Sequence, residues 1–478
     1  MVVPGAAARH GARLPGMKAP RPGRRVALLA RYPQHDPAMP QRIPNLGMRM
    51  VEASLRAAGL ADLEVKVWDL EPAGADAETL AEEVIAFDPD VVGFSVFLWS
   101  FPFFLEVAAQ VKADDPRRLI VFGGPSARPV MLNHLPHRQR AAAVDLLVIN
   151  EGEATFVDIV ALADRSAAEL SRLPGLAVAI DEGWRETMAR PLGDLNLLPS
   201  PYEMELIPPG GLGILQTYRG CPFTCSFCEW GTLESPKRVR SVESLGDEFN
   251  AMARLGLGAA LLADAGLNLN NGAFLNLRSA VEETGFLAGR GLICEVYPAT
   301  VRQDHLDFLR AIGNPFVGVG LQSFDTAVLA QVERKYDEAR FEQTLGALGE
   351  VASVAVEVIM GLPGDTPENF RRNFARARRL PCALRVYYCV VLPSALMVRS
   401  PPEHALDYDP VSLKMRSCLG WPPGAIAAEA EFLDRETARQ GGQAGEFFWI
   451  FPPPRVGRAP RRGAISGSFR DTAALGVS

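Results

Sequence analysis

Three cysteines lie within eight residues near the middle of this 478-residue chain, in the stretch Cys221-Pro-Phe-Thr-Cys225-Ser-Phe-Cys228. Cysteine thiolates are the usual protein ligands of iron–sulfur clusters. On one short loop, three thiolates can hold three irons of a [4Fe–4S] cluster and leave the fourth iron open to a substrate or cofactor. The alternatives are a zinc site and buried structural cysteines. Zinc sites usually take four ligands in two pairs, and the sequence has no second Cys-x-x-Cys pair, so the spacing favours a cluster.

The motif Cys-x3-Cys-x2-Cys, with the aromatic Phe227 directly before the last cysteine, resembles that of the radical S-adenosylmethionine (SAM) enzymes. The resemblance implies that Cys221, Cys225 and Cys228 bind the cluster and that SAM binds the open iron. It also implies that Phe227 packs over the cluster or the adenine of SAM, although plain core packing is equally typical of an aromatic residue. In this family the reduced cluster cleaves SAM, and the resulting radical abstracts hydrogen from an unactivated carbon.

Further along the chain, four polar residues stand in or just after otherwise apolar strand segments: Glu295, Gln322, Arg334 and Glu357. A polar group buried inside a barrel must be paired. The spacing of the four resembles the SAM-binding set of oxygen-independent coproporphyrinogen dehydrogenase, a radical SAM enzyme. By that resemblance, Glu295 and Arg334 hold the methionine end of SAM, where the arginine fork suits a carboxylate. Gln322 and Glu357 hold the ribose. The alternative is a structural network of Glu and Arg side chains.

Two further positions, each close in sequence to one of these four residues, are expected to bind SAM. Ser323 directly follows Gln322. The segment Gly361-Leu-Pro-Gly lets the backbone pass close to the adenine, although this motif is weak by itself.

Two residues are candidates for catalysis. Tyr297 lies two residues after Glu295, so both side chains are expected on the same side of a strand. Tyr297 is therefore expected to face the cavity as a substrate-side or proton-transfer residue. Asp264 directly follows the apolar segment Ala259-Ala-Leu-Leu-Ala. It is expected to bind the ammonium group of SAM or to face a second cofactor, with a solvated strand-end aspartate as the alternative.

The N-terminal third alternates short apolar runs with segments of helical spacing, beginning with Arg25-Val-Ala-Leu-Leu-Ala-Arg. This alternation predicts a doubly wound parallel sheet, Rossmann-like and of the flavodoxin type. Ligands of such sheets bind at the carboxyl ends of the strands, and glycines let the backbone approach a ligand closely. The residues at these predicted ends are Ser95, Val96, Gly123, Gly124, Pro125, Gly152 and Glu153. A flavodoxin-like domain that merely has tight turns is the alternative.

Three stretches of this domain, Val92-Gly-Phe-Ser-Val, Val121-Phe-Gly-Gly-Pro-Ser-Ala and Ile149-Asn-Glu-Gly-Glu-Ala-Thr-Phe, resemble the cobalamin-binding domain that precedes many radical SAM cores. The resemblance places the chain near the class B radical SAM methyltransferases and implies that the seven strand-end residues contact a cobalamin. The motif Asp-x-His-x-x-Gly, which supplies a histidine lower ligand in other cobalamin domains, is absent, and His35-Asp-Pro has the wrong order. A cobalamin would therefore be bound without a histidine lower ligand.

The predicted fold class is α/β. A Rossmann-like cobalamin-binding domain is expected at residues 24–165, a linker at 166–210, and a partial (β/α)6 TIM-type radical SAM barrel of six strand–helix units at 211–400. A small C-terminal region of helices and irregular structure, 401–454, either caps the barrel and lines a substrate pocket or simply packs against the barrel. A disordered leader is expected at 1–23 and a disordered tail at 455–478.

Charge and composition limit the partners. The formal net charge of −7 gives no reason to expect nucleic acid or an anionic membrane. No apolar run reaches the roughly 18 residues of a membrane span. Seven cysteines, three of them in one loop, do not read as a disulfide framework. A cluster needs a reducing compartment, which predicts a cytoplasmic location, and an electron donor such as a flavodoxin or ferredoxin is the expected protein partner.

Together these motifs predict a cobalamin-dependent radical SAM methyltransferase. It would move a methyl group from SAM through methylcobalamin to a carbon, or less readily a phosphorus, of a small metabolite or peptide in specialised-metabolite biosynthesis. One alternative is a cobalamin-dependent radical SAM enzyme that catalyses a rearrangement or an oxidation without methyl transfer. Another is a non-catalytic cobalamin-binding protein with a vestigial core, against which the intact cysteines argue.

Overall fold

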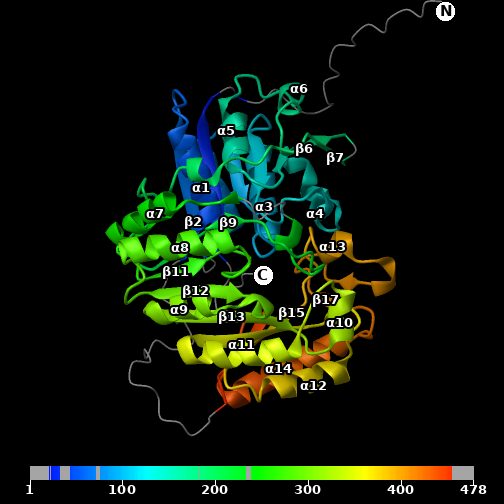
Figure 1. Ribbon diagram of the computed structural model, residues 1–478. Coiled ribbons are helices and arrows are strands. Elements are labelled where there is room, and N and C mark those ends of the chain that lie inside the picture. The colour runs from blue at the N-terminus through cyan, green and yellow to red at the C-terminus, as the bar shows by residue number, and fades with distance from the viewer. Residues whose placement is uncertain are drawn as a thin grey trace, which may run out of the picture. The chain divides into compact units, whose positions relative to one another are not determined.

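The computed structural model describes residues 21, 23–32, 43–71, 76–181, 183–232 and 238–454 (Figure 1). Most of the expected leader, the expected tail and His35 lie outside the described residues. The chain divides into two compact units, with the boundary between Leu192 and Gly193; Tyr32–Arg49 group with the second unit.

The first unit is built on a seven-stranded sheet in the order β2-β1-β3-β4-β5-β6-β7. The first five strands are parallel, and β6 and β7 add antiparallel at one edge. The order 2-1-3-4-5 is that of flavodoxin-like sheets, which confirms the predicted fold class of this part. The strands are β1 (Arg25–Arg31), β2 (Glu64–Leu70), β3 (Val91–Ser95), β4 (Leu119–Gly123), β5 (Leu146–Val148), β6 (Leu176–Ile180) and β7 (Gly183–Glu186).

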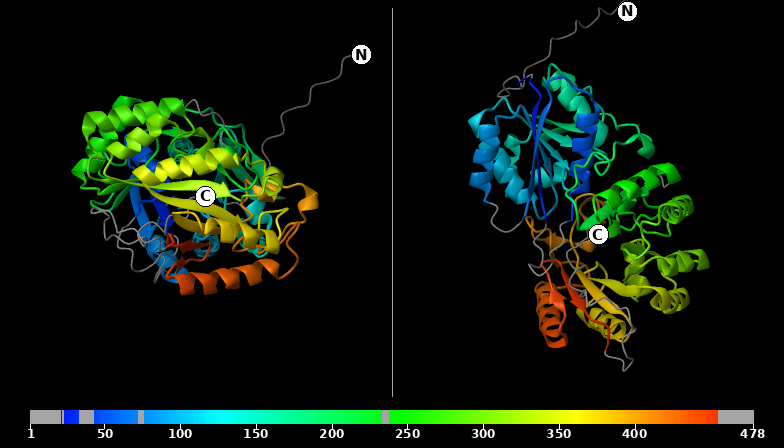
Figure 2. Two further views of the ribbon diagram at one scale, coloured as in Figure 1. Left: turned by 60° about the horizontal axis from the view of Figure 1, so that its bottom comes forward. Right: turned by 90° about the vertical axis from the view of Figure 1, so that its left-hand side faces the viewer.

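Helices cover both faces of this sheet (Figure 2). They are α1 (Leu46–Ala57), α2 (Ala77–Phe87), α3 (Phe101–Asp114), α4 (Pro129–Asn133), α5 (Glu153–Ala161) and α6 (Ala167–Leu170), with a 3-10 segment at His137–Ala143. Strand β1 is buried from Val26 to Ala30, because a parallel strand between two helical layers must be apolar on both sides. Helix α2 begins after Asp76, whose carboxylate accepts a 2.9 Å hydrogen bond from the Thr79 amide.

The first unit extends beyond residue 165, where the sequence suggested that a linker begins. Strands β6 and β7 occupy part of the expected linker, and the unit ends at Leu192. The physical reason is burial: Leu176, Ala177 and Val178 are at most 1% exposed beside β5. The linker is therefore shorter than expected.

The second unit is built on an eight-stranded sheet in the order β18-β19-β15-β14-β13-β12-β11-β8. Six strands, from β8 to β15, are parallel, which confirms the expected partial barrel. They are β8 (Leu212–Leu215), β11 (Ala259–Leu262), β12 (Gly291–Val296), β13 (Asn314–Gln322), β14 (Ser353–Met360) and β15 (Ala383–Tyr388).

The helices of this unit follow their strands and pack outside the curved sheet (Figure 2). They are α7 (Val242–Arg254), α8 (Asn271–Thr284), α9 (Gln303–Ala311), α10 (Thr326–Gln331), α11 (Glu338–Val351), α12 (Pro367–Ala377), α13 (Leu396–Arg399) and α14 (Ala425–Gln440). Three-residue 3-10 segments lie at Leu195–Leu197, Trp230–Thr232, Pro298–Thr300 and Pro402–His404. Phenylalanines on successive helices, such as Phe249, Phe274 and Phe341, join the outward-facing strand residues in one hydrophobic core.

The C-terminal region is more regular than the sequence suggested. Strand β19 (Phe448–Phe451) pairs antiparallel with β15, and β18 (Gln443–Ala444) pairs with β19. Trp449 and Phe451 are buried in the barrel core because β19 continues the sheet. Two short ladders complete the unit, β9 (Tyr218–Arg219) with β10 (Arg238–Val239) and β16 (Asp407–Tyr408) with β17 (Met415–Ser417).

Among the described residues, no helix combines the length and the apolar character that a membrane span requires.

Gly93 in the centre of β3 tests the packing of the first unit. A Cβ atom at this position would lie 2.6 Å from the Phe156 ring of α5, so Gly93→Ala must displace that ring. We expect a loss of about 1–3 kcal/mol in the free energy of unfolding, as for other overpacked cores. Urea unfolding followed by circular dichroism measures it.

Gly246→Ala in α7 is the matched control, because the nearest atom to its Cβ would lie at 3.8 Å. In a helix interior this change should stabilise by about 0.5–1 kcal/mol. Equal stability of the Gly93→Ala variant and the unmodified protein would contradict the close packing of α5 on β3.

Candidate functional site

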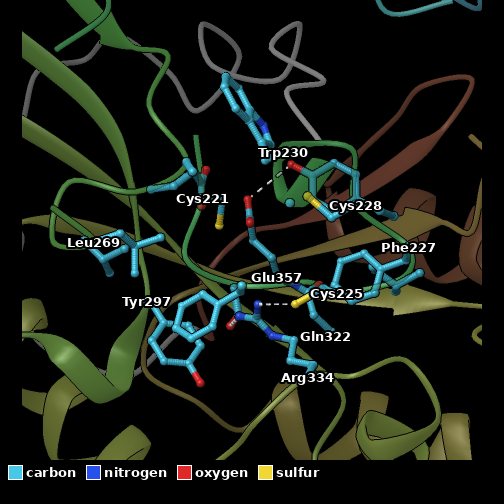
Figure 3. Close-up of a pocket in the computed structure, with 18 of the residues that line it drawn as sticks. Cys221, Cys225, Phe227, Cys228, Trp230, Leu269, Tyr297, Gln322, Arg334 and Glu357 are labelled. Atoms are coloured by element: carbon cyan, nitrogen blue, oxygen red, sulfur yellow. Dashed lines mark hydrogen bonds between the residues drawn. The ribbon is translucent and has the colours of Figure 1, made fainter. Parts of the chain in front are cut away.

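The three motif cysteines line one pocket at the carboxyl end of the barrel strands. Figure 3 shows the side chains of Cys221, Cys225 and Cys228 turned toward a common space. All three thiols are free, and Cys225 is 6% exposed. Three thiols on one loop provide the donor set for three irons of a [4Fe–4S] cluster.

Backbone hydrogen bonds hold the cysteine loop in shape, one within the loop and one to a distant segment. The Cys228 amide donates to the Cys225 carbonyl at 3.1 Å, and the Ser226 amide donates to the Val332 carbonyl at 3.1 Å. Gly231, just after the motif, packs so tightly that a Cβ there would lie 2.3 Å from the Phe223 carbonyl oxygen. Burial raises the pKa of the Cys228 thiol to about 11. Iron binding must therefore displace protons from the loop.

A network of buried charges lies on the strands beside the cysteines. The carboxylate of Glu357 on β14 accepts hydrogen bonds of 3.2 Å from Arg385 Nη1 and from the Tyr387 hydroxyl, both on β15. Glu357, Arg385 and Tyr387 all line the pocket, together with Glu295 of β12. Burial, followed by the nearby Glu357 carboxylate, raises the pKa of Glu295 well above its usual value. The site thus holds a carboxyl pair balanced by guanidinium groups.

The strand pattern explains why Glu295 faces this space. Along β12, Leu292, Cys294 and Val296 enter the hydrophobic core, so the residues between them face the pocket. Gly318 on the adjacent β13 makes room for the carboxyl group. A Cβ at Gly318 would lie 2.2 Å from Glu295 Oε1, so only glycine permits this position.

Gln322 at the end of β13 and Arg334, which follows α10, line the same pocket. The pairing of β13 with β14 shifts register between Gly320 and Gln322, and Gln322 has φ +69°. Such a bulge re-aims a side chain at a strand end, and a non-glycine residue with positive φ stores strain of the kind found at functional sites. The Arg334 guanidinium donates to the Gly320 carbonyl and lies 3.9 Å from Cys225 Sγ. Arg334 therefore connects the polar residues that are expected to bind SAM to the cysteine loop.

Tyr297 lines the pocket, as its spacing from Glu295 predicts. Its hydroxyl donates to the Lys335 carbonyl at 2.8 Å, and the Arg334 guanidinium lies 5.1 Å from its ring centroid. Phe223 of the cysteine loop contacts the same ring, with 4.5 Å between ring centroids. Asn268 fixes the Tyr297 backbone, donating to its carbonyl at 2.7 Å and accepting from its amide at 3.0 Å. The ring is therefore held firmly.

Asp264 is 4% exposed, so it is not the solvated strand-end residue that was one alternative. Its carboxylate accepts from the Thr217 amide at 2.9 Å and pairs with the Thr217 hydroxyl, at the start of the cysteine loop. Burial raises the pKa of Asp264 to about 7. The contacts fix the loop entry, and Asp264 also lines the pocket.

The other expected SAM residues divide between two locations. Phe227 lines the pocket and also packs against the barrel core. Ser323 and Gly361 are absent from the described lining of the pocket. The Ser323 hydroxyl accepts from the Asp325 amide at 3.1 Å and from Asn373 Nδ2 at 3.2 Å, while Gly361 takes φ +93°. A role in SAM binding stays a prediction for both.

In the first unit, the seven expected cobalamin residues follow three neighbouring parallel strands, β3, β4 and β5. Ser95 ends β3, Gly123 ends β4, and Glu153 starts α5 just after β5. The local backbone requires glycine at position 124, because Gly124 takes φ +100° and a Cβ would lie 2.8 Å from the Val96 carbonyl oxygen. The Val96 amide donates to the Gly123 carbonyl at 2.7 Å. Pro125 follows in the same turn.

Gly123 and Gly152 differ from Gly124 in this respect. Their φ angles are ordinary, and a Cβ would meet the nearest atoms only at 3.9 Å and 3.6 Å. The fold itself does not require glycine at either position. The bare backbone at this sheet edge therefore fits a ligand that approaches closely.

Sequence reasoning missed Arg385, Tyr387 and Asn268. A signal for Arg385 was present, because a charged residue inside the apolar run of β15 must find a buried partner. Gly318 and Gly320, alternating within β13, also mark a close approach that the sequence displays. Asn268 carried no such signal, because its partner is the backbone of another strand.

Asp264→Asn tests the electrostatics of the loop entry. The amide can keep both contacts to Thr217, but it cannot ionise. Since the pKa of Asp264 is about 7 in the folded chain and about 4 when unfolded, its contribution to stability is full below pH 4 and is lost as the pH rises through 7. Relative to the unmodified protein, the variant should gain about 1.4 kcal/mol per pH unit across that window.

Thermal unfolding at several pH values measures this difference. Asp247→Asn, at an exposed position of α7, is the control and should follow the unmodified protein. Parallel pH profiles for Asp264→Asn and the unmodified protein would show that the carboxylate ionises normally.

Comparison with known proteins matches both units to described families. The B12 binding domain model matches residues 38–160, and the Radical SAM superfamily model matches residues 215–377. The cobalamin-dependent radical SAM methyltransferase TokK of Streptomyces tokunonensis is 27% identical over 409 residues, covering 80% of this chain and 57% of TokK. The 2-(S-pantetheinyl)-carbapenam-3-carboxylate methyltransferase of Streptantibioticus cattleyicolor is 27% identical over 377 residues, covering 73% and 53% of the two chains.

A solved structure shares the fold. The radical S-adenosylmethionine methyltransferase TsrM from Kitasatospora setae, with tryptophan and a SAM analogue bound, superposes with a TM-score of 0.63 at 20% identity and covers 78% of this chain and 75% of TsrM. This chain spans little more than half the length of the two curated relatives. The two family matches confirm the predicted cofactors, a [4Fe–4S] cluster, SAM and cobalamin. The chain thus carries a B12 binding domain followed by a radical SAM domain, which is the domain pair of cobalamin-binding radical SAM enzymes.

Proposed function

We propose that this protein is a cobalamin-dependent radical SAM methyltransferase that acts on a carbon centre of a small metabolite or peptide. One observation carries the proposal: the three motif cysteines line the same pocket as Glu295, Gln322, Arg334 and Glu357. The methyltransferase activity of two relatives similar over most of this chain supports it. When bound, the cofactors supply SAM cleavage and methyl transfer through cobalamin.

The chain's own residues bind and orient SAM in this proposal. Cys221, Cys225 and Cys228 hold the cluster. Arg334 binds the SAM carboxylate, for which its planar fork is suited. Glu295, in its carboxylate form, binds the ammonium group. The raised pKa of Glu295 implies that this cation releases a proton from the buried carboxyl pair when it binds.

Gln322 and Glu357 bind the ribose of SAM in this proposal. Arg385 and Tyr387 each donate to the Glu357 carboxylate at 3.2 Å and hold it in place, and Arg385 supplies the countercharge. Tyr297 lies on the substrate side, where its fixed ring positions the reacting molecule. Asp264 supports the loop entry through Thr217. Phe227 excludes water from the cluster side of the pocket.

In the first unit, we assign cobalamin binding to the strand-end residues Ser95, Val96, Gly123, Gly124, Pro125, Gly152 and Glu153. The glycines that the fold does not require, Gly123 and Gly152, support this assignment. An electron donor such as a flavodoxin or ferredoxin, neither nucleic acid nor membrane as partner, and a cytoplasmic location complete the proposal.

Anaerobic reconstitution with iron, sulfide and cobalamin, followed by incubation with methyl-labelled SAM, tests the activity. We expect a [4Fe–4S] cluster bound through the three motif cysteines, together with bound cobalamin. Both S-adenosylhomocysteine and 5′-deoxyadenosine should be released. Cys225→Ala should abolish both products, while Cys382→Ala, at a buried core cysteine, should retain them if it folds.

The products also separate the alternatives. Deoxyadenosine without S-adenosylhomocysteine would indicate a non-methylating radical enzyme. Retention of function in Cys225→Ala would indicate a binding protein. A reconstituted protein that holds the cluster but never cobalamin would contradict the proposal.

Gly318→Ala tests the assignment of Glu295 to SAM. Since the added Cβ would lie 2.2 Å from Glu295 Oε1, the carboxyl group must move. Loss of one charge-assisted hydrogen bond is worth about 1.5–3 kcal/mol, so we expect the Kd for SAM to rise at least tenfold. Isothermal titration calorimetry under anaerobic conditions measures it. Gly346→Ala in α11, where a Cβ meets no atom within 4 Å, is the control. Unchanged SAM affinity in Gly318→Ala would remove Glu295 from the SAM site.

A further inference from the structure

A second guanidinium, in addition to that of Arg334, contacts the cysteine loop. Arg399 ends the short helix α13, beyond the last parallel strand of the barrel. Its Nη2 atom donates to the Cys228 carbonyl at 2.8 Å and also to the Cys225 carbonyl. One amino group thus joins the main chain of two of the three motif cysteines, more than 170 residues away in sequence.

A second contact ties the same segment to the loop. Glu229, directly after Cys228, accepts a 2.9 Å hydrogen bond from the Ser394 amide. The loop is therefore bound at both Glu229 and the Cys225–Cys228 turn by the segment that runs from Ser394 to Arg399.

Arg399 differs from Arg334 in what it contacts. Arg334 lines the pocket and lies 3.9 Å from Cys225 Sγ, whereas the described lining of the pocket does not include Arg399. The Nε atom of Arg399 is buried and has no hydrogen-bond partner in the described part of the chain. A partly desolvated cation behind the thiol ligands is costly unless nearby negative charge compensates it.

A [4Fe–4S] cluster held by three thiolates supplies such charge. Its reduction potential depends on net charge, on hydrogen bonds and on solvent exposure around the sulfurs. Reduction adds one negative charge, so a fixed cation nearby favours the reduced cluster. A cation that also donates to the main-chain carbonyls of two ligand cysteines restrains the turn that carries their thiolates.

We propose that Arg399 is a positioning residue of the iron–sulfur cluster, which fixes the Cys225–Cys228 turn and favours the reduced cluster without taking part in SAM binding. This inference rests on the proposed function, since it requires that the cysteines hold a cluster. The step is a one-electron reduction by the external donor, and Arg399 neither gains nor loses an electron or a proton in it.

The test uses the full chain reconstituted anaerobically with iron, sulfide and cobalamin. Arg399→Met removes the charge and the donor, and Arg399→Lys keeps the charge and a donor on a shorter stem. Arg416→Met is the control, because Arg416 is exposed and pairs with Asp407 at 2.9 Å away from the loop. Redox titration monitored by electron paramagnetic resonance gives the potential, and iron release to a chelator gives cluster lability. Calorimetry gives the Kd for SAM.

We expect Arg399→Met to lower the reduced-to-oxidised ratio at a fixed potential about tenfold, equivalent to about 59 mV for a one-electron couple. Iron release should be faster, and the Kd for SAM should stay within twofold. Arg399→Lys should restore the potential toward that of the unmodified protein, and Arg416→Met should match it.

An Arg399→Met variant with an unchanged potential would overturn the inference, as would a Lys variant that is shifted as far as the Met variant. If Arg399→Met does not fold, Arg399→Gln, which removes the charge but keeps a donor, takes its place, and an unchanged potential in that variant would overturn the inference. Faster iron release at an unchanged unfolding temperature supports the role, and unchanged iron release overturns it. Failure of the unmodified protein to hold a cluster would instead contradict the proposed function.

Discussion

The pocket of the second unit depends on buried charged side chains that must be neutralised by partners. Glu295, Glu357 and Arg385 stand on three parallel strands whose other residues are mostly apolar, and a buried charge on such a strand needs a partner. Arg385 and Tyr387 satisfy Glu357, while Gly318 leaves space for Glu295. Replacing such a network with apolar residues is often neutral or stabilising. Stability alone therefore does not explain the network.

The same constraint explains the arrangement of the cysteine loop. The loop has little regular structure of its own, and its shape depends on contacts from elements far away in sequence. Asp264 fixes its entry through Thr217, and Arg399 holds the carbonyls of its central turn. Arg334 approaches Cys225 from the segment between α10 and α11. Each contact pairs a charged side chain with a backbone or sulfur group, because a loop at a strand end offers few apolar contacts.

The carboxyl ends of the strands in the first unit carry different kinds of residue from those of the barrel. The sheet edge of the first unit presents mainly backbone and glycine, with Glu153 as the one charged residue among the seven strand-end positions. Gly124 is required by the local turn, whereas Gly123 and Gly152 leave space that the fold does not fill. A bare backbone permits the close approach that the proposed binding of cobalamin, a large cofactor, would require. The paired ions of the barrel suit the small charged cofactor SAM that we propose for them.

The sequence alone determined the two α/β architectures, the cysteine motif and the polar residues of the barrel. Local periodicity specifies parallel strands that are buried on both faces, and Cys-x3-Cys-x2-Cys is a feature of adjacent residues. The sequence also displayed Arg385 within an apolar strand, but it could not identify the partner. Only the tertiary structure joined Arg385 to Glu357, Arg399 to the cysteine carbonyls, and Asn268 to the Tyr297 backbone. It likewise placed β19 beside β15 and extended the first unit to Leu192. These features depend on side chains and strands that meet across long stretches of chain, where no local pattern records the pairing.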